Sequence, residues 1–110
     1  MIVGVGIDAV PVERMRRALA RTPSIEGRVF TEGERRSAAG RVASLAARFA
    51  AKEAVRKALR AVIAWRDIEV VSAPDRSPSV RVAGRDDLWF HVSLTHTDEV
   101  AMAVVVAETR

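Results

Sequence analysis

The spacing of apolar and polar positions divides the chain into a mainly helical first half and a second half of strands. Residues 2 to 7, "IVGVGI", are β-branched and spaced by glycine. That pattern favours a strand whose backbone lies close to another element. Helical spacing of apolar residues then continues to about residue 62, and from residue 67 onward the apolar positions alternate. A period of two is typical of strands, so the pattern predicts an α+β fold.

The first expected helix is short, amphipathic and basic. Pro11 suits the first turn of a helix, and the apolar residues of Val12–Arg21 recur on one side of it. Another side gathers three arginines: Arg14, Arg17 and Arg21. A solvated charged face explains such a group in an ordinary domain, and an acidic partner is the alternative explanation.

Two further helices are expected, the second much longer than the first. Thr31, followed three residues later by Glu34, matches the capping-box pattern of a helix start. After a break at Ser37–Arg41, the long helix is expected from Ala43 to about Val62. Its apolar arc consists of Ala47, Ala51, Ala54, Val55, Ala58, Leu59 and Val62.

Four strands are expected in the second half: "DIEVVSA", "SVRVAG", "LWFHVSLTH" and "VAMAVVVAE". Short turns between them imply antiparallel pairing. The last strand has apolar residues on both of its faces. This predicts that helices cover one face and that a neighbouring subunit covers the other. We therefore expect one domain, residues 1–110, with an antiparallel sheet packed against one long and two shorter helices.

Composition limits the function classes. A formal charge of +4 and a pI near 10.9 indicate an acidic or phosphorylated partner. The absence of cysteine excludes disulfides, thiolate chemistry and cysteine-based zinc sites. The N-terminal segment has no basic leader and is much shorter than the ~20 apolar residues of a membrane span, so we expect a cytoplasmic protein.

The segment "RFAAKEAVRKALR", residues 48–60, places one carboxylate, Glu53, among five cations. Glu53 and Lys57 lie on one face of the helix, opposite the apolar arc. An exposed ion pair at this spacing is one explanation. The other is a site in which Glu53 binds a divalent cation while Lys57 neutralises phosphate. Magnesium suits this second explanation, because it usually takes only one or two carboxylates.

Asp8 and His96 are the other candidates for chemistry. Asp8 ends the first predicted strand and is either a second metal ligand or a turn-forming, N-capping residue ahead of Pro11. His96 closes an apolar row with Phe90, Val92 and Leu94. It is either a buried structural histidine or a group that reaches a phosphate or a reacting hydroxyl.

Taken together, these segments resemble the holo-[acyl-carrier-protein] synthases, the small trimeric 4'-phosphopantetheinyl transferases. The matching pieces are "GVGIDAVPVERM", "RVFTEGE", "RFAAKEAVRKAL", "WRDIEVV" and "HVSLTHTDEVAMAVVV", in the family's order across nearly the whole chain. The resemblance implies the phosphopantetheinyl transferase fold. It also implies transfer of the phosphopantetheine arm of coenzyme A to a serine of an acyl, polyketide or peptidyl carrier protein.

The resemblance also implies roles for individual residues. Asp8 and Glu53 would bind Mg²⁺ at the pyrophosphate, Lys57 would contact phosphate, and Arg48 and His96 would contact the nucleotide. Glu53, His96 and a water bound to the metal are candidates for removing the serine proton. The basic helix, with Arg14, Arg17 and Arg21, would dock the acidic carrier protein, and the active site would lie between subunits of a homotrimer.

Three segments depart from the family pattern. Arg60 stands where a glycine is common, the connection to "WRDIEV" is short, and the segments "DRSPSV" and "GRDDLW" are also reduced. These changes favour, as an alternative function, a family-derived protein that binds carrier proteins without transferring the arm. An RNA-binding domain is a third possibility suggested by charge, but the 5% aromatic content and the absence of ribonucleoprotein-type motifs argue against it.

Overall fold

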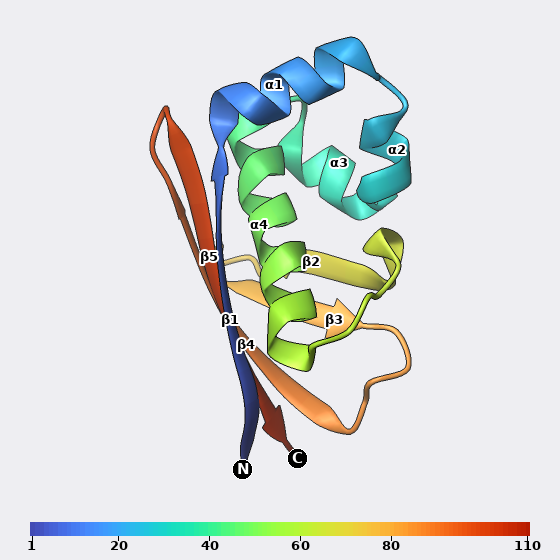
Figure 1. The fold of residues 1–110 in the computed structure, drawn as a ribbon, viewed down its shortest axis with the longest axis vertical. Coiled ribbons are helices and arrows are strands. Elements are labelled where there is room, and N and C mark those ends of the chain that lie inside the picture. Colours follow the sequence, from blue (N-terminus) through green and yellow to red (C-terminus); the bar gives the residue numbers. More distant parts are fainter.

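The computed structural model describes all residues, 1–110, and its centre is the long helix α4 (Val42–Leu59) lying across a sheet of three long strands (Figure 1). Those strands are β1 (Ile2–Pro11), β4 (Leu88–His96) and β5 (Val100–Thr109), in the order β1-β5-β4 and all antiparallel. A separate antiparallel pair, β2 (Ile68–Ser72) and β3 (Pro78–Val82), lies beside α4. The expected strands and the antiparallel pairs β2–β3 and β4–β5 are confirmed, but the pairing implied between β3 and β4 is wrong, because these strands lie in separate sheets.

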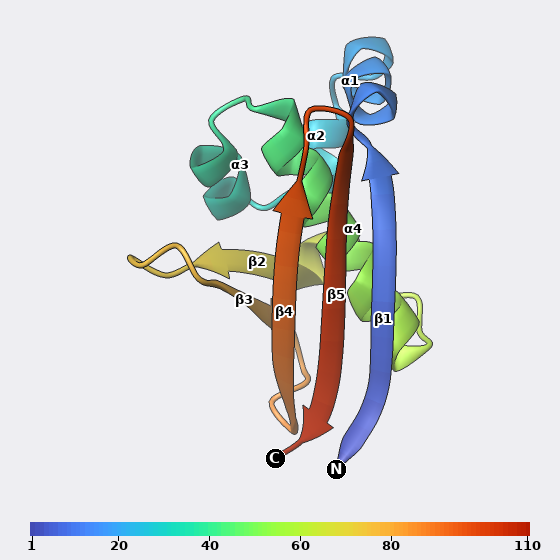
Figure 2. The ribbon, with the colours of Figure 1, turned by 90° about the vertical axis from the view of Figure 1, so that its left-hand side faces the viewer.

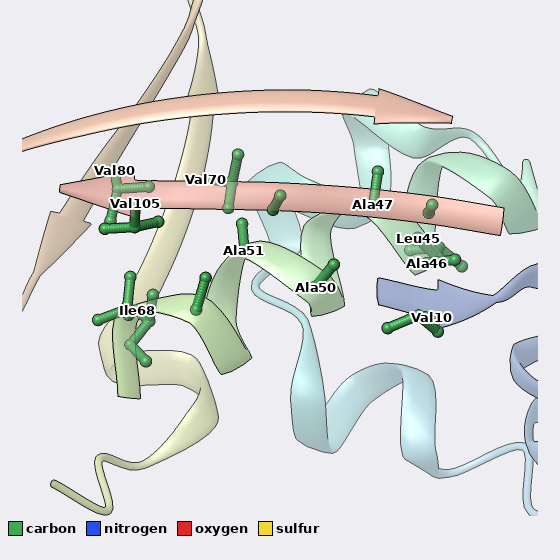
Figure 3. Close-up of a cluster of buried hydrophobic side chains, with 14 of the residues drawn as sticks. Val10, Leu45, Ala46, Ala47, Ala50, Ala51, Ile68, Val70, Val80 and Val105 are labelled. Atoms are coloured by element: carbon green, nitrogen blue, oxygen red, sulfur yellow. The ribbon is translucent and has the colours of Figure 1, made fainter. Parts of the chain in front are cut away.

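Glycine and alanine allow α4 to approach the sheet closely. A side chain at Gly4 would place its Cβ 1.8 Å from the carbonyl oxygen of Ala58, and one at Gly6 would place it 1.9 Å from that of Ala54. The inner face of β5 is similarly small, with buried alanines at 101, 103 and 107. Figure 3 shows Val105, Ala47 and Ala51 in this interface, which is packed too tightly for larger side chains. The expected close approach of the first strand is confirmed.

The helices at one end of the molecule are α1 (Val12–Arg21), α2 (Ile25–Val29) and α3 (Glu32–Ala38). The expected α1 and the capping box of α3, formed by Thr31 and Glu34, are confirmed. The short helix α2 was not expected, because its sequence has no period long enough to detect.

The long helix ends earlier than expected. Arg60 adopts a left-handed conformation (φ 52°, ψ 44°) and stops α4 after Leu59. Val62 therefore lies in the following loop and is 91% exposed, so its placement in the apolar arc was wrong. A short 3-10 helix, η1 (Trp65–Asp67), then leads into β2. The turns after β2 and β3 contain no helix.

The sheet has one covered and one open face (Figure 2). No helix covers the side of β1 and β5 turned away from α4. The exposed side chains there are Val3, Val5, Ile7 and Met102, with Val104 and Val106 half-buried. The expected helical cover of β5 is confirmed on its inner face. No helix of the structure has the length and apolar character needed to span a membrane.

Candidate functional site

A cavity of about 670 Å³ opens between β1, α1, α2, α4 and η1. Its lining is mostly apolar, and the aromatic part comes from Phe30, Phe49 and Trp65. Two carboxylates, Asp8 and Glu53, lie in the same lining although they are distant in sequence. The fold thus brings together the two residues that the sequence alone could not place near each other.

Asp8 owes its position to the length of β1. The strand continues to Pro11 instead of ending at Asp8, so Asp8 shares the face of Gly4 and Gly6 that packs on α4. Its Oδ1 accepts a hydrogen bond from Lys57 Nζ at 2.9 Å. The turn-forming and N-capping interpretation of Asp8 was therefore wrong.

Lys57 pairs with Asp8 of β1 and not with Glu53 of its own helix. Its Nζ donates to Asp8 and to the backbone carbonyl of Ile7, the latter at 3.0 Å. Glu53, one turn earlier on α4, is half-buried and forms neither a hydrogen bond nor an ion pair in this structure. The intrahelical pair between Glu53 and Lys57 is not formed, which leaves the Glu53 carboxylate available to a ligand.

The donor set fits a hard divalent cation. Asp8 and Glu53 are joined by no further metal-binding side chain, since the structure contains no cluster of three or more histidine, cysteine or acidic residues that could hold a metal. Two carboxylates at one cavity are nevertheless what Mg²⁺ commonly takes from protein, because it completes its shell with water and phosphate oxygens. The positive charge of Lys57 stands beside this pair and could offset further negative charge on a ligand.

The other cations of α4 point elsewhere. Lys52 is fully buried and forms an ion pair with Glu34 of α3, at 2.8 Å between Nζ and Oε1. Burial lowers the pKa of Lys52, while its hydrogen bond with Glu34 opposes that shift. Arg56 donates from Nε to the carbonyl oxygen of Ile63 at 2.9 Å and stacks on Trp65. Of the five cations in the segment, only Lys57 contacts a cavity carboxylate.

Arg48, expected to contact the nucleotide, does not line the cavity. Its side chain is only 7% exposed and donates to the backbone carbonyl and the hydroxyl of Ser44, while its Nε has no partner. Burial lowers the pKa of its guanidinium, and the charge of Glu34 partly offsets this effect. Its role toward a nucleotide remains a prediction.

His96 is exposed at the end of β4, so the interpretation as a buried structural histidine was wrong. It lies opposite Ala101 of β5 and on the same face of β4 as Leu94, which is the face turned to α4. The sheet order places β4 and β1 on opposite sides of β5, so His96 lies outside the cavity that holds Asp8. Its contact with a nucleotide also remains a prediction.

The basic helix α1 borders the same cavity. Arg14 lines it and makes no ion pair, Arg17 shares Glu13 with Arg16, and Arg21 is exposed in the last turn. Arg28 of α2 also lines the cavity and likewise makes no ion pair. Arg28 was not predicted from the sequence, because nothing in its local pattern separates it from an ordinary surface arginine.

Comparison with known proteins identifies the family of this chain. Residues 4–105 match the family model of the 4'-phosphopantetheinyl transferase superfamily. A holo-[acyl-carrier-protein] synthase of Salinispora arenicola is 50% identical over 121 residues, covering 98% of this chain and 99% of that protein. The chain belongs to the 4'-phosphopantetheinyl transferase superfamily. The expected family and enzyme class are thereby confirmed.

Solved structures of this family share the fold over the full chain. The acyl carrier protein synthase of Mycobacterium tuberculosis is 40% identical with a TM-score of 0.85 and covers 100% of both chains. The holo-(acyl-carrier-protein) synthase of Bacillus anthracis, solved in complex with CoA (3',5'-ADP), is 34% identical with a TM-score of 0.89. It covers 100% of this chain and 99% of its own. The expected fold class is therefore confirmed.

The alignment with the Salinispora protein is longer than the 110 residues of this chain, so that relative carries residues that are absent here. In the structure, the connections at residues 60–64, 73–77 and 83–87 are all short. The trimmed segments noted in the sequence thus form compact turns that leave the pocket carboxylates in place.

Proposed function

We propose that this chain transfers the 4'-phosphopantetheine arm of coenzyme A to a serine of an apo acyl carrier protein. The proposal depends on one observation: in a chain of this family, Asp8 and Glu53 line the same cavity, and Lys57 donates a hydrogen bond to Asp8. The relatives named as holo-[acyl-carrier-protein] synthases, and the relative solved with CoA, support the same reaction.

In the proposed reaction, the serine oxygen bonds to the β-phosphorus of coenzyme A. The bond from that phosphorus to the bridging oxygen breaks, and adenosine 3',5'-bisphosphate leaves with the electron pair. The serine proton passes to a base, for which Glu53 and His96 are the candidate side chains. Glu53 lines the cavity and has no hydrogen-bond partner, which favours it over His96 on geometry.

Three residues of the chain would neutralise the negative charge of the pyrophosphate, two of them through a bound metal ion. Asp8 and Glu53 would hold Mg²⁺, which when bound supplies Lewis-acid neutralisation of the phosphate oxygens. Lys57 lies beside Asp8 with half of its side chain exposed, so its ammonium can turn to a phosphate oxygen without a large desolvation cost. Fixed charges placed where negative charge accumulates are an effective form of catalysis.

The carrier protein would dock on α1. Arg14, Arg17 and Arg21 lie on the exposed surface of this helix, and Arg14 reaches the cavity itself. An acidic partner on α1 would bring its serine to the cavity that holds Asp8 and Glu53. Steering by such a basic surface predicts carrier binding that weakens with salt. We also place this reaction in the cytoplasm, as the sequence led us to expect.

We further propose a homotrimer with the active site between subunits. The uncovered apolar face of β1 and β5 supports association, because monomers rarely leave such a face in water. Arg48 and His96 do not line the cavity of their own chain, and contact with a nucleotide held by a neighbouring copy would agree with their predicted roles.

Mass spectrometry of the carrier protein tests the transfer. Incubation with Mg²⁺, coenzyme A and an apo carrier should add one phosphopantetheine to the carrier, and Glu53→Gln should abolish the addition. Glu32→Gln is the matched control, because Glu32 is an exposed acidic residue of α3 outside the cavity. Salt-sensitive carrier binding without any mass gain, across several carriers, would support the alternative of a binding protein without transferase activity.

Mixing inactive variants tests the shared site. Co-refolded Glu53→Gln and His96→Ala chains should regain part of the activity, because some sites in mixed trimers receive an intact residue from each copy. Glu53→Gln mixed with Asp8→Asn should not recover, because both residues line one cavity of one chain. Equal recovery in both mixtures, or a monomer in sedimentation, would contradict the proposed assembly.

A further inference from the structure

Trp65 forms an aromatic wall of the cavity beside Glu53. Its ring lies 5.1 Å from that of Phe49, centroid to centroid, at an interplanar angle of 47°. Phe49 lies four residues before Glu53 on α4, so the two side chains share one side of the helix. All three residues line the cavity, which places an apolar aromatic surface next to the carboxylates.

The backbone and the ring of Trp65 are held from the same helix. Arg56 places its guanidinium carbon 3.3 Å from the centroid of the Trp65 ring, which is a stacked cation–π contact. Lys52 donates from Nζ to the carbonyl oxygen of Trp65 at 2.8 Å. Arg56 also donates to the carbonyl oxygen of Ile63, so it fixes the chain on the N-terminal side of Trp65. Two cations of α4 therefore set the position of one aromatic side chain.

The chemistry of coenzyme A indicates which part of the ligand would meet this wall. On one side of its pyrophosphate lies the nucleotide, with its polar ring system and 3'-phosphate. On the other side the arm begins with a methylene group, and the next carbon carries two methyl groups. If Asp8 and Glu53 hold Mg²⁺ at the pyrophosphate, as in the proposed function, the neighbouring aromatic surface suits the dimethyl group better than the charged phosphates of the nucleotide.

We propose that Trp65 binds the dimethyl end of the coenzyme A arm and that Arg56 is a positioning residue that holds Trp65 for this contact. This inference rests on the proposed function and adds a specificity determinant to it. Arg56 itself is turned to Ile63 and Trp65 and does not line the cavity, so it acts through the tryptophan.

Tryptophan fluorescence tests the contact directly. The chain has two tryptophans, so in a Trp89→Phe background the emission comes from Trp65 alone. Coenzyme A with Mg²⁺ should change this emission, whereas adenosine 3',5'-bisphosphate, which lacks the arm, should leave it unchanged. An equal response to both ligands, or no response in a protein that still modifies its carrier, would overturn the inference. So would a response to carrier protein alone, because the wall would then contact the carrier.

Kinetics test the positioning role. Arg56→Met should raise KM for coenzyme A about three- to tenfold, in keeping with the strength of a cation–π contact, and leave kcat within about twofold. Arg56→Lys should restore part of the affinity because it keeps the charge near the ring. Arg66→Met is the matched control, since Arg66 is adjacent to Trp65 in η1 but has no side-chain partner there.

The two proposals fail in different ways. Absence of any carrier modification by the unaltered protein would remove the proposed function. Normal modification with an unchanged KM in Arg56→Met would remove only the role of Arg56. If Arg56→Met does not fold, Trp65→Phe and Trp65→Ala provide the test, because the smaller side chain should raise KM for coenzyme A more than phenylalanine does.

Discussion

Two lysines of α4 each pair with a carboxylate, and their surroundings differ sharply. Lys52 meets Glu34 at 2.8 Å with both side chains 0% exposed. Lys57 meets Asp8 at 2.9 Å, with the lysine 52% and the aspartate 17% exposed. The distances are nearly equal, so distance alone cannot separate a structural pair from a functional one.

The difference lies in the remaining partners. Lys52 has three acceptors, since its Nζ also donates to the backbone carbonyls of Trp65 and Ile68, while Glu34 accepts from the backbone of Thr31 and Val70. Removing either partner would leave the other as a buried charge without a counter-ion. The pair of Lys57 and Asp8 lies at the edge of the cavity and can exchange partners with a ligand at little cost. The first pair fixes the fold, and the second is suited to chemistry.

The largest expected effect follows from breaking the buried pair. Lys52→Met leaves Glu34 buried without its cation and should lower the free energy of unfolding by about 3–5 kcal/mol. Chemical denaturation measures this change, and Lys57→Met serves as the control on the same helix. A loss below about 1 kcal/mol for Lys52→Met would show that the pair does not hold α3 to α4.

Breaking the exposed pair should separate activity from stability. Lys57→Met should change the free energy of unfolding by less than about 1 kcal/mol, because exposed ion pairs contribute little. Its rate of carrier modification should fall about 10²-fold, because a cation beside the reacting phosphate is lost. Mass spectrometry of the carrier measures the rate at saturating Mg²⁺. A variant as active as the unaltered protein would place Lys57 outside the reaction.

A third change attacks the contact that brings Asp8 to α4. Gly6→Ala would put a Cβ 1.9 Å from the carbonyl oxygen of Ala54, so the strand or the helix must shift. We expect a loss of stability of about 1–3 kcal/mol from overpacking, together with reduced transfer as Asp8 moves. Gly27→Ala is the control, because its Cβ would meet only the end of the Arg35 side chain, at 3.3 Å. Equal stability of the two variants in thermal unfolding would contradict this explanation.

Periodicity and the family motifs together predicted most of the fold and the carboxylates of the site. The strand pattern is local, and the glycine spacing of β1 correctly indicated a close neighbour. Motif resemblance then linked Asp8 to Glu53, which lie far apart in sequence and have no local signal that joins them. The capping box predicted the place of Glu34 at a helix start, but not its second role as the partner of Lys52.

The remaining features depend on tertiary contacts. The helical pattern gives no sign of the partners of Lys52 and Arg56, because α3, β2 and η1 supply them only once the chain has folded. The same holds for Arg48, whose burial no charge pattern predicts. In the sequence, Trp65 is an isolated aromatic residue before a strand, and its contacts with Arg56 and Phe49 form only in the folded chain. Sequence reasoning therefore identified the carboxylates but not what surrounds them.

The smallest expected effect concerns the end of the helix that carries both pairs. Arg60 ends α4 at φ 52°, a conformation that costs a residue with a side chain more than it costs glycine. Arg60→Gly should relieve that strain but lose the favourable charge at the helix C-terminus and gain freedom in the unfolded chain. We expect a net stabilisation of about 0.5 kcal/mol, with both lysine pairs intact.

Thermal unfolding of Arg60→Gly checks this expectation, and Arg76→Gly, at φ 68° in the turn after β2, is the matched control away from α4. Both variants should have a slightly higher unfolding temperature than the unaltered protein. Carrier modification should be unchanged in Arg60→Gly, because the helix already ends at this residue and Lys57, in its last turn, keeps its pair with Asp8. A stabilised but less active Arg60→Gly would mean instead that the arginine side chain itself takes part in binding, beside the Lys57 pair in the last turn of α4.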